Sequence, residues 1–181
     1  MKTAAFLLTV FGAVGALAAD APPVAKMHDA ILSSAEKEIV SLAEAMPADK
    51  YDFAPTQGAF QGVRTFGQQV KHLAAVVYMV SAASLGEKPP VDTGNENGPA
   101  DVKTKQQIVD YLKASFAYAH KAMNALTAEN ENALVPSPFG QGKMMRGSAA
   151  DVAVWHSFDH YGQMVVYARM NGIIPPASAG K

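Results

Sequence analysis

His156 and His160 are the residues whose type and spacing most directly suggest chemistry. They lie four positions apart, in the run His-Ser-Phe-Asp-His, so a helix would place both imidazoles on one face, one turn apart. Imidazoles in that arrangement can ligate one metal ion. The same spacing arises by chance among hydrogen-bonded core histidines, and the run lacks the Glu that follows the first His in H-E-x-x-H zinc sites. Spacing alone therefore leaves a metal site and a pair of core residues as alternatives.

A third histidine, His72, lies in another helical segment, close to Gln69. The face that carries it is apolar, as is the face of His156 and His160, so both faces are expected to point inward. Three neutral imidazoles from two helices can bind a divalent metal ion, namely zinc, nickel or iron, and leave a coordination position open. An open site suits catalysis, because the metal lowers the pKa of a bound water or polarises a carbonyl group.

Metal-binding imidazoles need a partner for the second ring nitrogen, which sets the tautomer. The nearest polar candidates are Gln69, Gln163 and Asp159, and the sequence does not select among them. Tyr167 follows on the face of His160 and is expected to line the same pocket. Asp159 adjoins His160 in sequence but points about 100° away on a helix. No general acid or base is therefore evident beside the three histidines.

Four segments with helical periodicity must position these residues. Apolar spacing, capping residues and Gly or Pro stops predict the four helices, over residues 24–46, 65–86, 104–127 and 148–170. Little strand signal occurs, so the expected fold class is an all-α four-helix bundle in one domain. The fourth helix is apolar on nearly every side, which predicts a helix buried among its neighbours. The other two histidines, His28 and His120, have polar or charged neighbours and are expected to be solvated at the surface.

Capping signals mark three of the predicted helix starts. Thr65 with Gln68, Thr104 with Gln107 and Ser148 with Asp151 each fit the capping-box spacing.

The connections between the helices carry turn residues. The loop over residues 47–64 contains Tyr51, Phe53 and Phe60, which are expected to pack onto the core rather than to stack on a ligand. Gly, Pro, Asn and Asp predict a surface crossing over residues 86–101. Residues 128–147 are expected to be irregular, with a tight turn or short hairpin near residues 139–142.

The first 18 of the 181 residues predict a secretory signal peptide. Met1-Lys2 is a basic start, residues 3–15 form an apolar run, and Ala16-Leu17-Ala18 fits a cleavage site. The expected location is therefore the periplasm or the exterior, with an uncleaved anchor as the alternative. No segment after residue 18 has the apolar length of a membrane span. The chain has no cysteine, which excludes disulfides and thiolate ligands. The net charge of −1, without any basic run, argues against a nucleic-acid partner.

Several motifs in order resemble the DinB-like (DinB/YfiT-like) four-helix family. Residues 46–56 (Met-Pro-Ala-Asp-Lys-Tyr-Asp-Phe-Ala-Pro-Thr) are similar to its opening signature, and Val-Arg-Thr-Phe-Gly at 63–67, followed by His72, to its second-helix motif. Residues 156–163 and 169–176 are similar to its fourth-helix motif and tail. The resemblance covers residues 24–178, and each motif is weak alone. Taken together, the resemblance implies a bundle with an up-down-down-up course.

The resemblance also implies a divalent metal bound by one histidine of the second helix and two of the fourth, matched here by His72, His156 and His160. Relatives include metal-dependent transferases that use low-molecular-weight thiols, an isomerase of related fold and members without a known reaction; some form homodimers. The thiols that those transferases use are cytosolic cofactors. The predicted export of this chain therefore argues against a thiol-dependent transferase. We therefore expect an exported metal-dependent hydrolase or transferase of small molecules, with an unknown substrate. The alternatives are a non-catalytic metal-binding or stress-associated binding module, and a purely structural helical protein.

Overall fold

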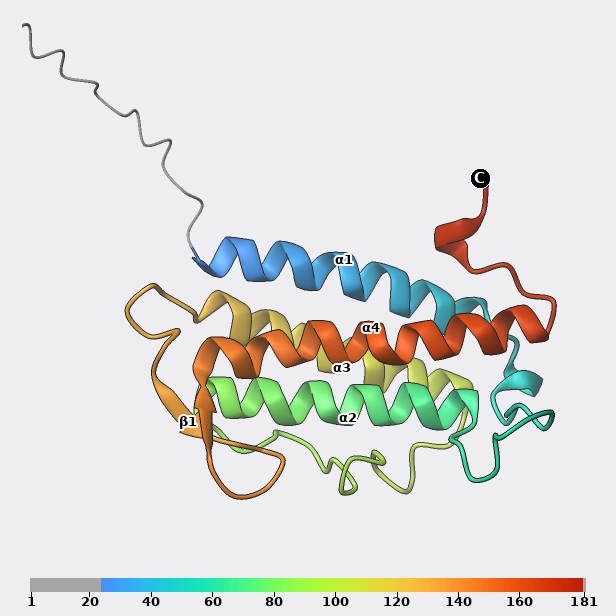
Figure 1. The fold of residues 1–181 in the computed structure, drawn as a ribbon, viewed down its shortest axis with the longest axis horizontal. Helices are drawn as coiled ribbons and strands as arrows, with labels where there is room; N and C mark the ends of the chain where they lie inside the picture. The colour runs from blue at the N-terminus through green and yellow to red at the C-terminus, as the bar shows by residue number, and fades with distance from the viewer. Residues whose placement is uncertain (1–23, 181) are drawn as a thin grey trace, which may run out of the picture.

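The computed structural model describes residues 24–180, in which four long helices pack side by side as a bundle (Figure 1). The predicted signal peptide lies outside these residues. No helix in the described part is long and apolar enough to span a bilayer. The helices are α1 (Val24–Ala45), α2 (Phe66–Leu85), α3 (Lys105–Asn124) and α4 (Arg146–Met170), with 3-10 turns at Ala48–Lys50 and Pro176–Ser178.

The helices form two pairs that run in opposite directions: α1 and α4 run one way, α2 and α3 the other (Figure 1). Helix α2 packs against α3 and α4, and α1 packs against the same two helices from the opposite side. Because α2 and α3 run in the same direction, the chain between them must return along the whole bundle, as the predicted long crossing requires. The antiparallel α2–α4 pair is the pair that positions the three histidines.

Two of the three predicted capping boxes are present. The Thr65 side chain accepts a hydrogen bond from the backbone N–H of Gln68, and the Gln68 side chain accepts one from the Thr65 N–H. Thr104 and Gln107 form the same reciprocal pair at the start of α3. Helix α2 is capped by Gly86, which directly follows Leu85 and has a left-handed φ of 73° that favours glycine. These local signals set the boundaries of the helix that carries His72.

The capping box predicted at Ser148 is wrong, because α4 begins earlier, at Arg146. The backbone N–H groups of Arg146 and Gly147 donate to the carbonyl oxygens of Ala133 and Glu131, each at 2.8 Å. These bonds satisfy donors that a side-chain cap would otherwise serve. Both partner carbonyls lie just before the hairpin. The predicted hairpin is confirmed as β1 (Leu134–Pro136) paired antiparallel with β2 (Lys143–Met145).

The loop before α2 closes over one end of the core through Tyr51. Its side chain is buried, its hydroxyl donates to the Ala43 carbonyl at 2.6 Å, and its ring meets the edge of Phe66 at 5.3 Å between centroids. Phe53 is half-buried and packs edge-on against Tyr167. The predicted packing is therefore confirmed for these two aromatics. It is wrong for Phe60, which lies at the exposed tip of the loop.

Helix α4 is not buried on all sides, contrary to the prediction from its composition. Its inward positions are filled largely by small residues, while large apolar side chains occupy the solvent face. Trp155 is 58% exposed and Val166 and Met170 are each 50% exposed, with Phe158 between them. These four residues share one stripe of the helix because their spacing follows its period. We call this set the α4 stripe.

Candidate metal centre

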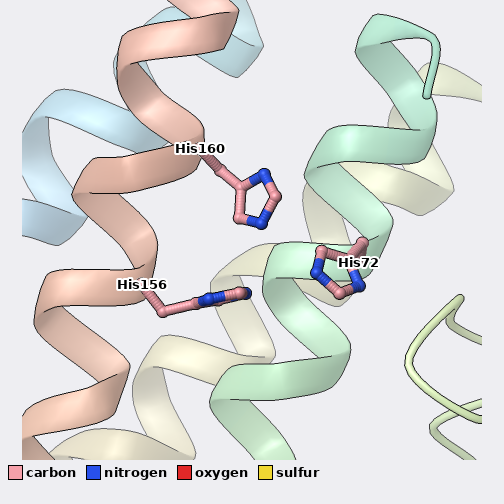
Figure 2. Close-up of side chains that lie close together, drawn as sticks. All are labelled: His72, His156 and His160. Atoms are coloured by element: carbon pink, nitrogen blue, oxygen red, sulfur yellow. The ribbon is translucent and has the colours of Figure 1, made fainter. Parts of the chain in front are cut away.

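The structure brings His72, His156 and His160 together between α2 and α4 (Figure 2). One ring nitrogen from each residue lies within 4.8 Å of one from each of the others. The centroid of the His72 ring is 5.2 Å from that of His156 and 4.7 Å from that of His160, and the two rings of α4 are 4.5 Å apart. The side chains thus converge on one point, as a shared metal ion requires.

Burial keeps all three imidazoles neutral at pH 7. His72 and His160 are 5% and 6% exposed, and His156 is half-buried. Burial, together with the neighbouring His156 and His72, lowers the pKa of His160 to about 3. Burial and the proximity of His72 lower the pKa of His156 to about 4. Burial also lowers the pKa of His72. Neutral imidazoles offer lone pairs to a cation without first losing a proton.

Two of the rings are oriented by hydrogen bonds outside the cluster. His72 Nδ1 lies 2.7 Å from the carbonyl oxygen of Glu96, and His160 Nδ1 lies 2.5 Å from Oε1 of Gln69. Both partners are acceptors, so both Nδ1 atoms carry hydrogen and both Nε2 atoms keep a free lone pair. The amide of Gln69 is itself oriented, because its Nε2 donates to Oε1 of Gln163 at 2.9 Å.

His156 supplies the test of whether this cluster suits a metal. Its Nε2 is buried and has no hydrogen-bond partner in residues 24–180. Leaving a buried polar atom unpaired costs about 1–3 kcal/mol. A cation at the point where the three rings converge would remove that cost. A neutral three-nitrogen donor set suits late first-row divalent ions without selecting among them.

The structure gives different partners to the other residues that were expected near the site. Gln69 and Gln163 lie beside the cluster, as their hydrogen bonds show. The hydroxyl of Tyr167 donates to the Arg64 carbonyl at 3.3 Å, and its ring packs edge-on against Phe53. A separate cavity of about 350 Å³, lined in part by Met79, lies between the end of α2 and the hairpin.

Two contributors to the site were missed by the sequence reasoning. The carbonyl of Glu96, in the crossing loop, orients His72; a backbone oxygen has no residue-type signature, so no signal could have identified it. Arg64 lies close enough for its charge to help lower the pKa of all three histidines. The signal available in the sequence was the position of Arg64, one residue before Thr65, which caps the helix that carries His72.

His28 and His120 are not solvated surface residues, as their neighbours in sequence had suggested. The ring nitrogens of His120 lie 2.7 Å from Oδ1 of Asp29 and 3.0 Å from Oε2 of Glu36, which ties α3 to α1. His28 Nδ1 lies 2.7 Å from Oδ1 of Asp151 and ties α1 to α4. Both rings lie within hydrogen-bond distance of carboxylates on neighbouring helices. These partners are distant in sequence, so the residues adjacent to each histidine do not reveal them.

Comparison with known proteins identifies the class to which this fold and site belong. The model of the DinB superfamily matches residues 31–164, so the chain belongs to that family. No curated protein matches the chain.

Three solved structures share the fold at low sequence identity. A DinB-like protein from Bacillus subtilis is 18% identical, over 81% of this chain and 92% of that one, with a TM-score of 0.62. A DinB-like protein from Bacillus cereus is 17% identical, over 81% and 93%, with a TM-score of 0.59. A conserved protein from Enterococcus faecalis is 18% identical, over 83% and 98%, with a TM-score of 0.64.

Proposed function

We propose that the chain is a metal-dependent enzyme, a hydrolase or transferase of small molecules, whose metal ion is held by His72, His156 and His160. The observation that carries this proposal is the convergence of three neutral imidazoles, one of which has a buried and unpaired Nε2. Three protein ligands leave a coordination position free for a substrate. A bound divalent ion would supply Lewis acidity there and lower the pKa of a coordinated water.

The residues of the chain have separable roles in this proposal. Gln69 and the Glu96 carbonyl hold the rings of His160 and His72 in the tautomer that offers Nε2. Gln163 holds Gln69 in turn. The apolar packing of α2 against α4 keeps these groups in place and limits access of water to the cluster.

The activity is tested with protein loaded with Zn²⁺, Ni²⁺ or Fe²⁺ against a panel of ester, amide, epoxide and thiol-transfer substrates. Turnover by the wild type that His160→Ala abolishes would support the enzyme proposal. Gln106→Ala, an exposed change on α3, serves as the control variant. Absence of turnover over the whole panel by fully loaded protein would remove the support for catalysis.

One observation favours a second candidate, a non-catalytic metal-binding module. Within residues 24–180, no carboxylate joins the three imidazoles, so the cluster includes no evident general acid or base. In this case the metal stabilises the bundle, because it binds the folded chain alone. The two candidates are separated by measuring the melting temperature and the turnover of the same metal-loaded samples. A rise in melting temperature without turnover indicates the binding module.

We also propose that the protein is exported to the periplasm or the exterior, on the basis of the signal-peptide pattern in residues 1–18. N-terminal sequencing of protein recovered from the periplasmic fraction would then begin close to Ala19. A start at Met1 would contradict cleavage.

A homodimer through the α4 stripe completes the proposed organisation. The stripe continues onto α1, where Met27 and Ile31 are 50% and 53% exposed. Gly162, in the middle of the stripe, is exposed, and a Cβ added there would meet nothing within 4 Å, so a second helix could approach the backbone closely at this point. A two-fold axis would place this apolar surface against its own copy. Sedimentation of the wild type as a dimer and of Val166→Lys as a monomer would support this interface.

A further inference from the structure

The crossing loop between α2 and α3 holds three consecutive residues in the left-handed region. The φ angles are 54° for Gly94, 49° for Asn95 and 69° for Glu96, and Gly98 follows with a φ of 74°. Asn95 and Glu96 are the only non-glycine residues with positive φ within residues 24–180. This region is unfavourable for a residue such as glutamate, because its Cβ crowds the backbone. Such strain persists only where surrounding contacts enforce it, and it gathers at functional sites.

Contacts within the loop enforce this conformation. The Gly98 N–H donates to the Thr93 carbonyl at 2.9 Å, and the Asn97 N–H donates to the Gly94 carbonyl at 3.1 Å. The two glycines approach each other so closely that a Cβ added at Gly94 would overlap the carbonyl oxygen of Gly98. The loop is therefore closed into a turn, and glycine is required at position 94.

The closed turn is bonded to α2 at two consecutive residues of that helix. Nζ of Lys71 donates to the Pro99 carbonyl at 2.8 Å, and Nδ1 of His72 donates to the Glu96 carbonyl at 2.7 Å. Gly98 packs directly on Lys71, because an added Cβ would lie 3.0 Å from Cε and 3.4 Å from the carbonyl oxygen of that lysine. Glu96 is thus both a strained residue and the one whose carbonyl faces a candidate metal ligand.

We propose that residues 94–98 form a strained latch that fixes the ring of His72 for metal binding, and that Gly94, Glu96 and Gly98 are its positioning residues. The carbonyl of residue 96 follows its N–Cα bond in the chain, so a change of φ there moves the oxygen that holds the ring. The latch therefore needs the backbone conformation of residue 96 and not its carboxylate. The inference rests on the proposed metal function, because a fixed ring keeps Nε2 directed at the ion.

A matched pair of variants at position 96 tests the latch. Glu96→Asn and Glu96→Val both remove the carboxylate, so they change the local charge equally. Asparagine tolerates the left-handed region, whereas β-branched valine is strongly disfavoured there. Competition titration with Zn²⁺ and a chromogenic chelator should give the wild-type affinity for Glu96→Asn. The affinity of Glu96→Val should be about 10- to 100-fold lower, as for the loss of an outer hydrogen bond to a metal ligand.

Gly98→Ala tests the latch from the side of α2, because it adds a Cβ against Lys71 at a left-handed φ. Gly172→Ala is its control. Gly172 follows the end of α4, has the same φ of 74°, and has nothing within 4 Å of an added Cβ. Both variants carry the backbone penalty and should lose thermal stability, but only Gly98→Ala should lose affinity for Zn²⁺. If Glu96→Val does not fold, this second pair decides.

The metal-free protein gives a readout that a merely structural role would not move. Ring nitrogen shifts in NMR should show His72 with hydrogen on Nδ1 in the wild type and in Glu96→Asn, and exchange between the two tautomers in Glu96→Val. Equal Zn²⁺ affinity in Glu96→Asn and Glu96→Val would overturn the latch while the metal proposal stands. Wild-type protein that binds no Zn²⁺ would overturn the metal proposal itself, and the latch with it.

Discussion

Nδ1 of His160 lies 2.5 Å from Oε1 of Gln69, so a residue of α2 orients an imidazole of α4. This contact crosses the same helix interface at which the three rings meet (Figure 2). Orientation of a ligand by an outer hydrogen bond sets both its tautomer and its basicity.

Gln69→Ala should therefore weaken metal binding by about 10- to 100-fold. The His160 ring would lose the acceptor for its Nδ1–H while all three ligands remain. Competition titration with a chromogenic chelator measures the effect, with Gln106→Ala as the exposed control. An unchanged affinity in Gln69→Ala would show that the amide does not orient the ring.

The three histidines make the stability of the metal-free protein depend on acidity. Their folded-state pKa values are lowered, to about 4 for His156 and about 3 for His160, against about 6.5 in the unfolded chain. The unfolded state therefore takes up these protons first as the pH falls. Their contribution is undiminished above pH 6.5 and is lost progressively from there toward pH 3.

Urea unfolding of the metal-free protein at a series of pH values measures this loss. His160→Gln should reduce the slope of stability against pH in that window, because one of the three groups no longer titrates. The ring proton shifts of the histidines in NMR should also stay at their neutral values at pH 5 for His156 and His160. A variant slope equal to that of the wild type would contradict the assignment.

His120 should show the opposite dependence. Burial alone would lower its pKa, but hydrogen bonds to Asp29 and Glu36 outweigh burial and raise it. Its stabilising contribution is then complete below pH 6.5 and is lost as the pH rises through the folded-state value. We expect His120→Gln to cost about 1 kcal/mol, given the partial exposure of the group, and to cost more at pH 6 than at pH 9. Equal losses of melting temperature at both pH values would contradict this. Glu36→Gln should give a smaller change, since Asp29 remains.

Local patterns in the sequence account for the part of the fold that was predicted. The Thr65 and Thr104 capping boxes depend on residues within one turn, and the inward faces of His72 and His160 follow from helical periodicity. These signals are read within about 20 residues, so no knowledge of the tertiary structure is needed.

The errors concern partners that are distant in sequence. The start of α4 is set by the carbonyls of Glu131 and Ala133, which accept hydrogen bonds from the N–H groups of Gly147 and Arg146, before Ser148. The apolar composition of α4 does not distinguish burial within the chain from exposure on a stripe around Trp155. The backbone carbonyl of Glu96 orients the ring of His72. Every residue has a backbone carbonyl, so the residue type at position 96 gives no signal of this role.

The central claim is that His72, His156 and His160 hold a divalent metal ion. Elemental analysis of protein purified without a metal-affinity tag tests it most directly, beside His160→Ala prepared in the same way. We predict close to one equivalent of a late first-row divalent metal per wild-type chain, and a loss of most of it in the variant. Wild-type protein that binds no metal even after soaking with Zn²⁺ and Ni²⁺ would contradict the claim and leave the three histidines as buried core residues.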